Sequence, residues 1–399
     1  MASLLLAIIY LAFISLGLPD SLLGAAWPEM HSVLGVELSA MGIVTTLISC
    51  GTVVSSLFSD KVVGRFSTQA VVTVSVGLTA VGLLGFSFAP TFAVLCLFAL
   101  PYGLGAGSID AALNNYVALH YTSRHMSWLH CFWGVGTVIS PYVMSYALGT
   151  EMGWAGGYKI VGGIQACILL ILIATLPVWK KAGHKNDITA DTGGSSEEKK
   201  SAGLIGSLKI KGVPYVLLGF LGYCAAESTV MVWASTYFFE AKSTTAEVAA
   251  ALGSLFFIGM TVGRFFSGFI SNRVGDKNMI RAGLAISAIG VIIIAIPSGL
   301  AVSIVGFLLI GLGFAPVYPS IIHSTPNSFG EENSQAIIGI QMASAYVGAT
   351  LAPPIFGLIA NYVDVRLMPL YIAVFMTMCF VMLELLNKQA KDKTALNEN

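Results

Sequence analysis

Two polar side chains, Asp110 and Asn114, lie four residues apart near the middle of an otherwise apolar stretch of the sequence. The i, i+4 spacing places both on one face of a helix, one turn apart. A carboxylate in a lipid-spanning helix is costly unless it is paired, protonated or wetted, so such an acid is a candidate functional site. It can bind a proton, ligate a hard cation such as Na⁺ or accept hydrogen bonds from a solute. The pair therefore indicates ion coupling or solute binding.

Two further acids fall inside apolar segments. Asp20 follows Gly17-Leu18-Pro19, where proline removes an amide hydrogen and should distort the helix. Broken helices near the bilayer midplane often line binding sites. Glu227 lies near the middle of its own apolar segment. We therefore predict that Asp20, Asp110 and Glu227 are the coupling carboxylates.

Amide, imidazole and aromatic side chains at similar depths are the predicted solute ligands. Amides can bind solute hydroxyls, and indole or phenol rings offer flat faces to a sugar ring. The alternative is that the polar groups bond between helices and that the aromatic rings anchor the protein at the membrane interface. The predicted substrate-binding set is Asn114, His130, Trp133, Gln165, Tyr223, Trp233 and Gln341.

The composition is that of an integral membrane protein. Hydrophobic residues make up 56% of the 399-residue chain and charged residues only 10%, against roughly 25% charged residues in soluble proteins. A spanning helix needs about 20 mainly apolar residues. Twelve such segments are predicted, at 3–26, 39–58, 68–88, 92–119, 128–148, 157–179, 213–239, 245–270, 279–297, 300–322, 334–360 and 366–386.

The distribution of basic residues predicts the orientation. Nearly all of them fall in one set of connections, and the opposite set holds only Lys159, Lys242 and Arg366. The positive-inside rule then places both termini in the cytoplasm. The first segment shows neither a basic start nor a cleavage site, so we expect a true span. The short termini and the absence of eukaryotic glycosylation sequons favour a bacterial inner membrane.

Other classes of partner are not indicated. The net charge of zero gives no sign of nucleic-acid binding, and the six cysteines fall singly in different spans. We therefore expect no metal site and no cofactor. The expected partners are a small solute, which the residue types above indicate to be a sugar, and the lipid bilayer. The protein is expected to act as a monomer.

The chain reads as two related halves. A polar Gly/Ser-rich segment, 183–211, predicts a cytoplasmic linker between the domains 1–182 and 212–399. Ser56-x3-Asp60-Lys61-x3-Arg65 matches Gly268-x3-Asn272-Arg273-x3-Lys277 at an offset of 212 residues, and Gly136-x4-Pro141 matches Gly348-x4-Pro353 at the same offset. Repeated matches in one order indicate an internal duplication of a six-span unit.

With these features the chain resembles the major facilitator superfamily. The charged connection after spans two and eight is typical of that family, although the first copy has Ser56 in place of glycine and one extra residue before Gly64-Arg65. Gly103-x-Gly105-x-Gly107-x-x-Asp110-x3-Asn114 is similar to the fucose/glucose symporter branch, which carries an acid and an Asn on span four and an acid on span one. The resemblance implies an all-α membrane fold of twelve transmembrane helices in two six-helix bundles.

Charges at the helix ends after spans two and eight can pair when the inner side of a transporter closes. We predict a cytoplasmic gate from them, while simple positive-inside topology explains the same pattern. The predicted gate residues are Asp60, Lys61, Arg65, Arg264, Arg273 and Lys277.

The sequence thus predicts a secondary active transporter that imports a monosaccharide or similar solute with protons, by alternating access. A sodium-coupled sugar symporter and a proton-coupled drug or metabolite efflux antiporter are the alternatives. The efflux reading is weakened because the run Gly134 to Pro141 lacks the glycines that follow such a proline in many exporters. A further alternative is a membrane receptor or scaffold that transports nothing. Enzymatic activity is not expected, since no nucleophile–base set or phosphate loop appears.

Overall fold

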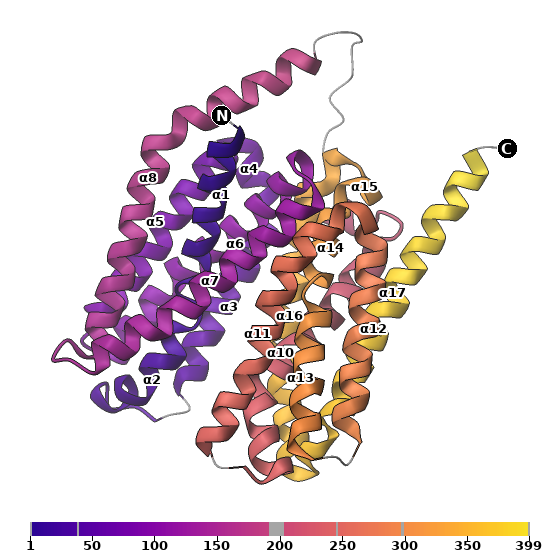
Figure 1. Ribbon diagram of the computed structural model, residues 1–399. Coiled ribbons are helices and arrows are strands. Elements are labelled where there is room, and N and C mark those ends of the chain that lie inside the picture. The colour runs from indigo at the N-terminus through magenta and orange to yellow at the C-terminus, as the bar shows by residue number, and fades with distance from the viewer. Residues whose placement is uncertain (1, 38–39, 191–202, 245, 297–298, 398–399) are drawn as a thin grey trace. The chain divides into compact units, whose positions relative to one another are not determined.

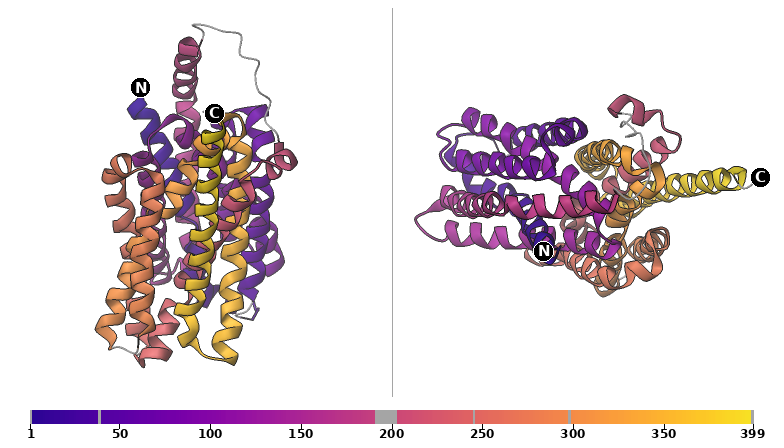
Figure 2. Two further views of the ribbon diagram at one scale, coloured as in Figure 1. Left: turned by 90° about the vertical axis from the view of Figure 1, so that its right-hand side faces the viewer. Right: turned by 90° about the horizontal axis from the view of Figure 1, so that it is seen from above.

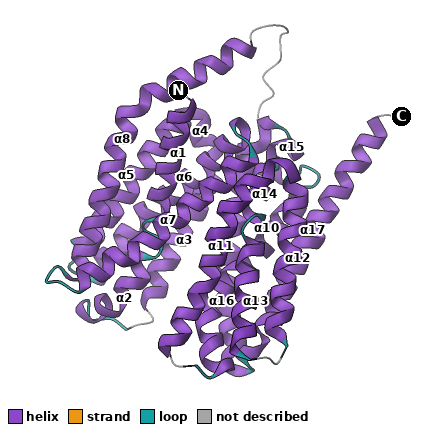
Figure 3. Cartoon of the chain, in the orientation of Figure 1, coloured by secondary structure: helices purple, strands orange, loops and turns teal. Residues whose placement is uncertain are grey.

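The computed structural model describes all residues except 1, 38–39, 191–202, 245, 297–298 and 398–399. Within the described residues helix is the only regular secondary structure (Figure 3). The chain divides into two compact units. The first comprises Met1–Tyr116 and Leu129–Gly203, and the second comprises Val117–Trp128 and Leu204–Asn399. The predicted all-α membrane fold is confirmed.

Eight helices begin in the first part of the chain (Figure 1). They are α1 (Ala2–Gly17), α2 (Leu22–Val33), α3 (Met41–Leu57), α4 (Ser59–Phe66), α5 (Thr68–Ser87), α6 (Phe92–His120), α7 (Ser123–Leu148) and α8 (Gly153–Ala190). The end of α6 and the start of α7, together with the turn between them, belong to the second unit.

The remaining helices belong to the second unit, apart from the first residue of α9. They are α9 (Gly203–Leu208), α10 (Val213–Lys242), α11 (Ala246–Val274), α12 (Asp276–Ala295), α13 (Leu300–Phe314), α14 (Val317–His323), α15 (Thr325–Phe329), α16 (Glu331–Tyr362), the 3₁₀ turn η2 (Val365–Leu367) and α17 (Met368–Asn397). The last turns of α17 project away from the other helices of this unit (Figure 2).

The described helices account for ten or eleven of the twelve predicted spans. Among the described residues, ten helical segments are long and apolar enough to cross a bilayer, and eleven if α3 and α4, bent by 57°, form one span. The other predicted span, 245–270, falls on the 29-residue helix α11 from residue 246 onward, and this helix is not among those ten or eleven. The predicted linker, 183–211, is partly helical at its two ends, in α8 and α9, and its middle lies outside the described residues.

The first span is broken where the sequence predicts it. Helix α1 ends at Gly17, and α2 begins at Leu22 after a turn in which the amide of Asp20 bonds the carbonyl of Gly17 at 3.3 Å. Because Pro19 has no N–H, the chain cannot continue the α-helical ladder through this point without losing a bond. The break places Asp20 at the end of a half-helix.

Small residues let the broken span approach α7 closely. A Cβ atom at Gly17 would collide with the carbonyl oxygen of Trp133, and one at Gly136 would collide with that of Ile14. Helices in membranes associate through such close backbone contacts, because lipid offers no hydrophobic drive between them. Glycine at both positions therefore fixes α1 against α7.

The close contacts repeat in the second unit. Gly136 on α7 packs on α1, and Gly348 on α16 packs on the carbonyl of Leu221 in α10. Gly103 on α6 packs on α3, and Gly311 on α13 packs on the carbonyl of Phe256 in α11. Equivalent glycines thus meet equivalent helices, which is the packing expected of a duplicated bundle.

Replacing Gly136 by Ala should lower the thermal unfolding midpoint, because the new methyl group meets the Ile14 carbonyl; overpacking of this kind costs about 1–3 kcal/mol. The matched control is Gly163→Ala on α8, where nothing lies within 4 Å of the added Cβ. The control should keep or slightly raise the midpoint. Equal midpoints for the two variants would contradict this packing.

Candidate functional site

In the first unit, the break after α1 presents a carboxylate to two aromatic donors. Asp20 Oδ2 accepts a hydrogen bond from the indole Nε1 of Trp133 at 2.8 Å, and Oδ1 accepts one from the hydroxyl of Tyr102 at 3.2 Å. Tyr102 is buried, Trp133 is half-buried and Asp20 is exposed. Asp20 and Trp133, predicted separately from the sequence, therefore form one accessible cluster.

A second hydrogen bond fastens this turn to α7. Pro141 lacks an N–H, so the carbonyl of Thr137, four residues earlier, has no helical donor. The hydroxyl of Ser21 donates to that carbonyl at 2.7 Å and lies 2.8 Å from the hydroxyl of Ser140. Proline in α7 thus creates the acceptor that holds the residue next to Asp20.

The predicted pair on α6 is joined by a histidine from α7. The amide Nδ2 of Asn114 donates to Asp110 Oδ1 at 2.7 Å and to the Asp110 carbonyl oxygen at 2.9 Å. The other end of the amide, Oδ1, lies 3.1 Å from Nε2 of His130. The three side chains are at most 6% exposed, and Phe13 of α1 packs edge-on against the imidazole. The sequence prediction of a shared face for Asp110 and Asn114 is confirmed.

The orientation of the Asn114 amide determines which ring nitrogen of His130 carries a hydrogen. Because the Asn114 NH₂ group has two acceptors on Asp110, its carbonyl oxygen faces His130. An amide oxygen only accepts, so Nε2 of His130 must carry the hydrogen. The line of donors therefore runs from His130 through Asn114 to the Asp110 carboxyl.

Gln165 lies elsewhere in the first unit. Its Nε2 donates to the Ser15 carbonyl at 3.0 Å and to Thr79 Oγ1 at 2.8 Å, and the side chain is completely buried. It thereby links α8 to α1 and α5. These contacts are those of a helix-bridging amide.

In the second unit the predicted acid is paired with a cation. Glu227 Oε1 lies 3.2 Å from Nη2 of Arg264 and 3.0 Å from the hydroxyl of Tyr223. The same hydroxyl lies 3.0 Å from the carbonyl oxygen of Phe314, the last residue of α13. Arg264 is 4% exposed, Glu227 9% and Tyr223 0%. This is a buried ion pair, so each charge depends on the other.

The structure places Arg264 well inside α11, ten residues before the helix ends. Arg273 and Lys277 are exposed at the junction of α11 and α12, and Asp60, Lys61 and Arg65 lie on α4. Arg264 therefore groups with Tyr223 and Glu227.

Gln341 and Trp233 both make contacts inside the second unit. Gln341 is fully buried on α16 and its Oε1 accepts from Thr325 Oγ1 at 3.1 Å. The Trp233 indole donates to the Pro353 carbonyl at 2.9 Å and packs edge-on against Phe356. The Trp233 N–H thus binds α16.

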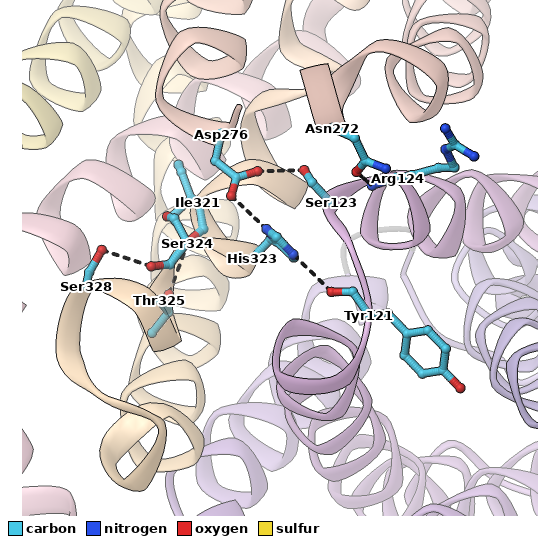
Figure 4. A network of polar contacts seen from close by, with 10 residues as sticks. All are labelled: Tyr121, Ser123, Arg124, Asn272, Asp276, Ile321, His323, Ser324, Thr325 and Ser328. Carbon is cyan, nitrogen blue, oxygen red and sulfur yellow. Dashed lines mark hydrogen bonds and ion pairs between the residues drawn. The ribbon is translucent and has the colours of Figure 1, made fainter. Parts of the chain in front are cut away.

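A further polar cluster joins the first residues of α7 to α11, α12 and α14 (Figure 4). Ser123 donates to Asp276 Oδ1 at 2.6 Å, His323 Nδ1 lies 2.7 Å from Asp276 Oδ2, and the Arg124 amide donates to Asn272 Oδ1 at 3.1 Å. Sequence reasoning missed Asp276 and His323. The signal available was that Asp276 directly follows the Asn272-Arg273-x-Gly275 motif, at the first position of the next helix.

Comparison with known proteins agrees with this architecture. Residues 9–251 and 216–398 match the family model described as Major Facilitator Superfamily. The chain is 23% identical to Bypass of stop codon protein 6 of Saccharomyces cerevisiae, over 94% of this chain and 79% of that protein. Two Bacillus subtilis proteins are also similar. Multidrug resistance protein 2 is 20% identical over 89% and 88% of the two chains, and the glucose/mannose transporter GlcP is 18% identical over 96% and 94%.

Solved transporter structures have the same fold. The crystal structure of the transporter FucP in the outward conformation superposes with a TM-score of 0.77 at 14% identity, covering 96% of this chain and 98% of FucP. The proton:xylose symporter XylE, bound to 6-bromo-6-deoxy-D-glucose, gives 0.76 at 13% identity, covering 96% and 95%. The predicted two-bundle membrane fold is therefore confirmed.

The energetic coupling between Arg264 and Glu227 in the second unit can be tested by substitution. Arg264→Met should lower the stability strongly, since it leaves the Glu227 carboxylate without its counter-charge; breaking a buried pair costs about 3–5 kcal/mol. Adding Glu227→Gln should restore most of the unfolding midpoint. A double variant no more stable than Arg264→Met alone would show that the two side chains are not coupled.

Proposed function

We propose that this chain, which belongs to the major facilitator superfamily, is a secondary active transporter that imports a monosaccharide or similar polyhydroxylated solute together with protons. It is a multi-pass membrane protein of a family of transporters, and we propose no enzymatic activity. We further propose the bacterial cytoplasmic membrane as its location, both termini in the cytoplasm, a monomeric state and transport by alternating access.

The observation that carries the proposal is the exposed carboxyl of Asp20 beside the half-buried indole of Trp133. A carboxylate accepts hydrogen bonds from vicinal hydroxyls, and an indole face packs on the apolar face of a sugar ring. The group lies at a break in a span, the kind of position where transporters of this architecture bind solutes. The similarity to a glucose/mannose transporter and to a xylose symporter supports a sugar as the solute.

The surroundings of the three acids disfavour Na⁺ as the coupling ion, and the neutral donors at Asp20 and Asp110 leave these two acids able to take up H⁺. Hard cations are held by several oxygen ligands at once. Here N–H and O–H donors approach the carboxyl oxygens: Trp133 and Tyr102 at Asp20, Asn114 at Asp110, and Arg264 and Tyr223 at Glu227. These donors occupy positions around the carboxyl oxygens that a cation would need. A proton requires no such set of ligands.

The acids then have different roles. Asp20 is accessible, so we assign it contact with the solute and the coupling proton. Asp110 is buried. Its partner Asn114 lies on the same helix and in turn contacts His130, so this group of side chains connects α6 to α7. Protonation of Asp110 would weaken the hydrogen bond that it accepts from Asn114. Because the other end of the Asn114 amide contacts His130, a shift of this amide would also alter the contact with His130 on the neighbouring helix. We therefore propose Asp110 as the acid that links protonation to helix movement.

Proton-coupled efflux is the second candidate, because the chain is also similar to Multidrug resistance protein 2. The two candidates differ in the direction of the proton and in the solute. Sugar uptake driven by an inward proton gradient distinguishes them directly.

In proteoliposomes, an inward proton gradient should drive accumulation of glucose, fucose or xylose, and a sodium gradient should not. Asp20→Asn should abolish the gradient-driven accumulation, because the amide cannot take up the coupling proton. The matched control is Glu240→Gln, an exposed acid near the end of α10 that should leave uptake unchanged. Uptake that follows sodium and ignores the pH gradient would overturn proton coupling, and export of hydrophobic cations without sugar uptake would favour efflux.

A further inference from the structure

Within the second unit, the turn before α7 and the first turns of α7 are held to α11, α12 and α14 at three places. One is the polar cluster of Ser123, Asp276 and His323, and another is the bond from the Arg124 amide to Asn272. The third is Trp128, whose indole donates to the Phe265 carbonyl at 3.3 Å. We call residues 121–128 the docking segment.

Trp128 fits a surface that only glycine provides. Its ring lies against Gly268, where a Cβ atom would collide with the indole, and it packs edge-on against Phe269 at 5.4 Å. The guanidinium of Arg124 lies 5.8 Å from the ring centre. Apolar packing therefore positions the docking segment, and the polar cluster lies beside it.

The polar cluster contains one proton more than a neutral imidazole and an ionised carboxylate would hold together. Nε2 of His323 faces the carbonyl oxygen of Tyr121 at 3.1 Å, and a carbonyl only accepts, so Nε2 carries a hydrogen. Nδ1 faces a carboxyl oxygen of Asp276 at 2.7 Å. A neutral imidazole has a hydrogen on one nitrogen only, so without a further proton the lone pair of Nδ1 would face a lone pair of the Asp276 carboxylate oxygen. A second proton must lie between His323 and Asp276.

The protein shields this proton and supplies one compensating acid. The side chains of His323 and Asp276 are 14% and 13% exposed. The other oxygen of Asp276 is occupied by the Ser123 hydroxyl, so the carboxylate is oriented by the docking segment itself. Both partners of the pair thus contact residues 121–123.

The other ionisable groups nearby are mostly basic. The docking segment contributes Tyr121, Arg124 and His125, and the exposed Arg273 and Lys277 flank Asp276 in the chain. Helices α13 to α15 add only Tyr318, and Glu384 of α17 is paired with Arg281 at 2.7 Å. The basic groups disfavour an added proton, so Asp276 must supply the attraction that retains it.

We propose that His323 and Asp276 form a proton-binding site that is occupied when the docking segment is in place and that loses its proton when the segment detaches. This site is separate from Asp20, Asp110 and Glu227, and it requires neither a sugar nor those acids. It goes beyond the proposed function by placing a second, inner-end proton on the transporter.

The sign of the pH dependence follows from linkage. The docked form binds one more proton than the detached form, so low pH favours docking and rising pH weakens it. Imidazole is the side chain whose charge ordinarily changes between about pH 5 and 8. Above the titration midpoint, one bound proton changes the ratio of docked to detached forms by up to about tenfold for each pH unit.

Hydrogen exchange of the full-length protein in lipid nanodiscs tests the site without substrate. Peptides that cover 117–128 are followed between pH 5.5 and 8, with labelling times scaled for the intrinsic pH dependence of amide exchange. We expect protection to fall as pH rises. Protection that does not change with pH would overturn the proposal.

Two substitutions separate a charged from a neutral imidazole. His323→Gln can donate and accept but cannot carry charge, so its segment should be poorly protected at every pH. His323→Lys keeps a positive charge opposite Asp276 and should be protected across the whole range. The matched control is His125→Gln, since the His125 ring packs on Tyr121 and Trp128 and should leave the pH dependence as in the wild type.

A His323→Gln variant as well protected as the wild type would show that the neutral form suffices, and the proposal would be wrong. A negative result in this exchange experiment would say nothing against proton-driven sugar uptake. It is therefore distinguishable from failure of the proposed transport function.

Discussion

In the hydrocarbon core of a bilayer a carboxyl group must find its partners within the protein, and this constraint governs the arrangement of both units. Asp20 receives an indole and a phenol, Asp110 receives an amide that a histidine orients, and Glu227 receives a guanidinium and a phenol. Each of these sets of hydrogen-bond partners requires helices that approach one another closely. The glycines on α6, α7, α13 and α16 provide that approach.

The duplicated bundles share their packing but differ in their chemistry. Gly136 and Gly348 occupy equivalent contacts, yet the first unit satisfies its acids mainly with neutral donors and the second uses a buried ion pair. An acid with neutral partners can gain a proton without leaving an opposite charge unpaired. Glu227 cannot do so without exposing the charge of Arg264. This contrast is the physical reason to assign proton binding to the first unit and a fixed charge to the second.

Periodicity and residue type were sufficient to predict much of this. The spacing of Asp110 and Asn114 predicted their shared face, and Gly17-Leu18-Pro19 predicted the break before Asp20. Contacts between distant helices were not predictable in this way. Nothing local in the sequence pairs Arg264 with Glu227 or Ser21 with the Thr137 carbonyl, because these contacts depend on how helices pack and on which carbonyls prolines leave free. His323 was missed for the same reason, since a lone histidine at a helix end carries no pattern.

The central claim is that solute and proton cross the membrane together through the acids of the first unit. Its most direct test is a pH recording of lightly buffered vesicles that contain the protein and carry no imposed gradient. Adding the transported sugar outside should make the outer medium more alkaline as protons enter with it, and the signal should be absent with Asp20→Asn. Sugar entry with no change in the external pH would contradict the account.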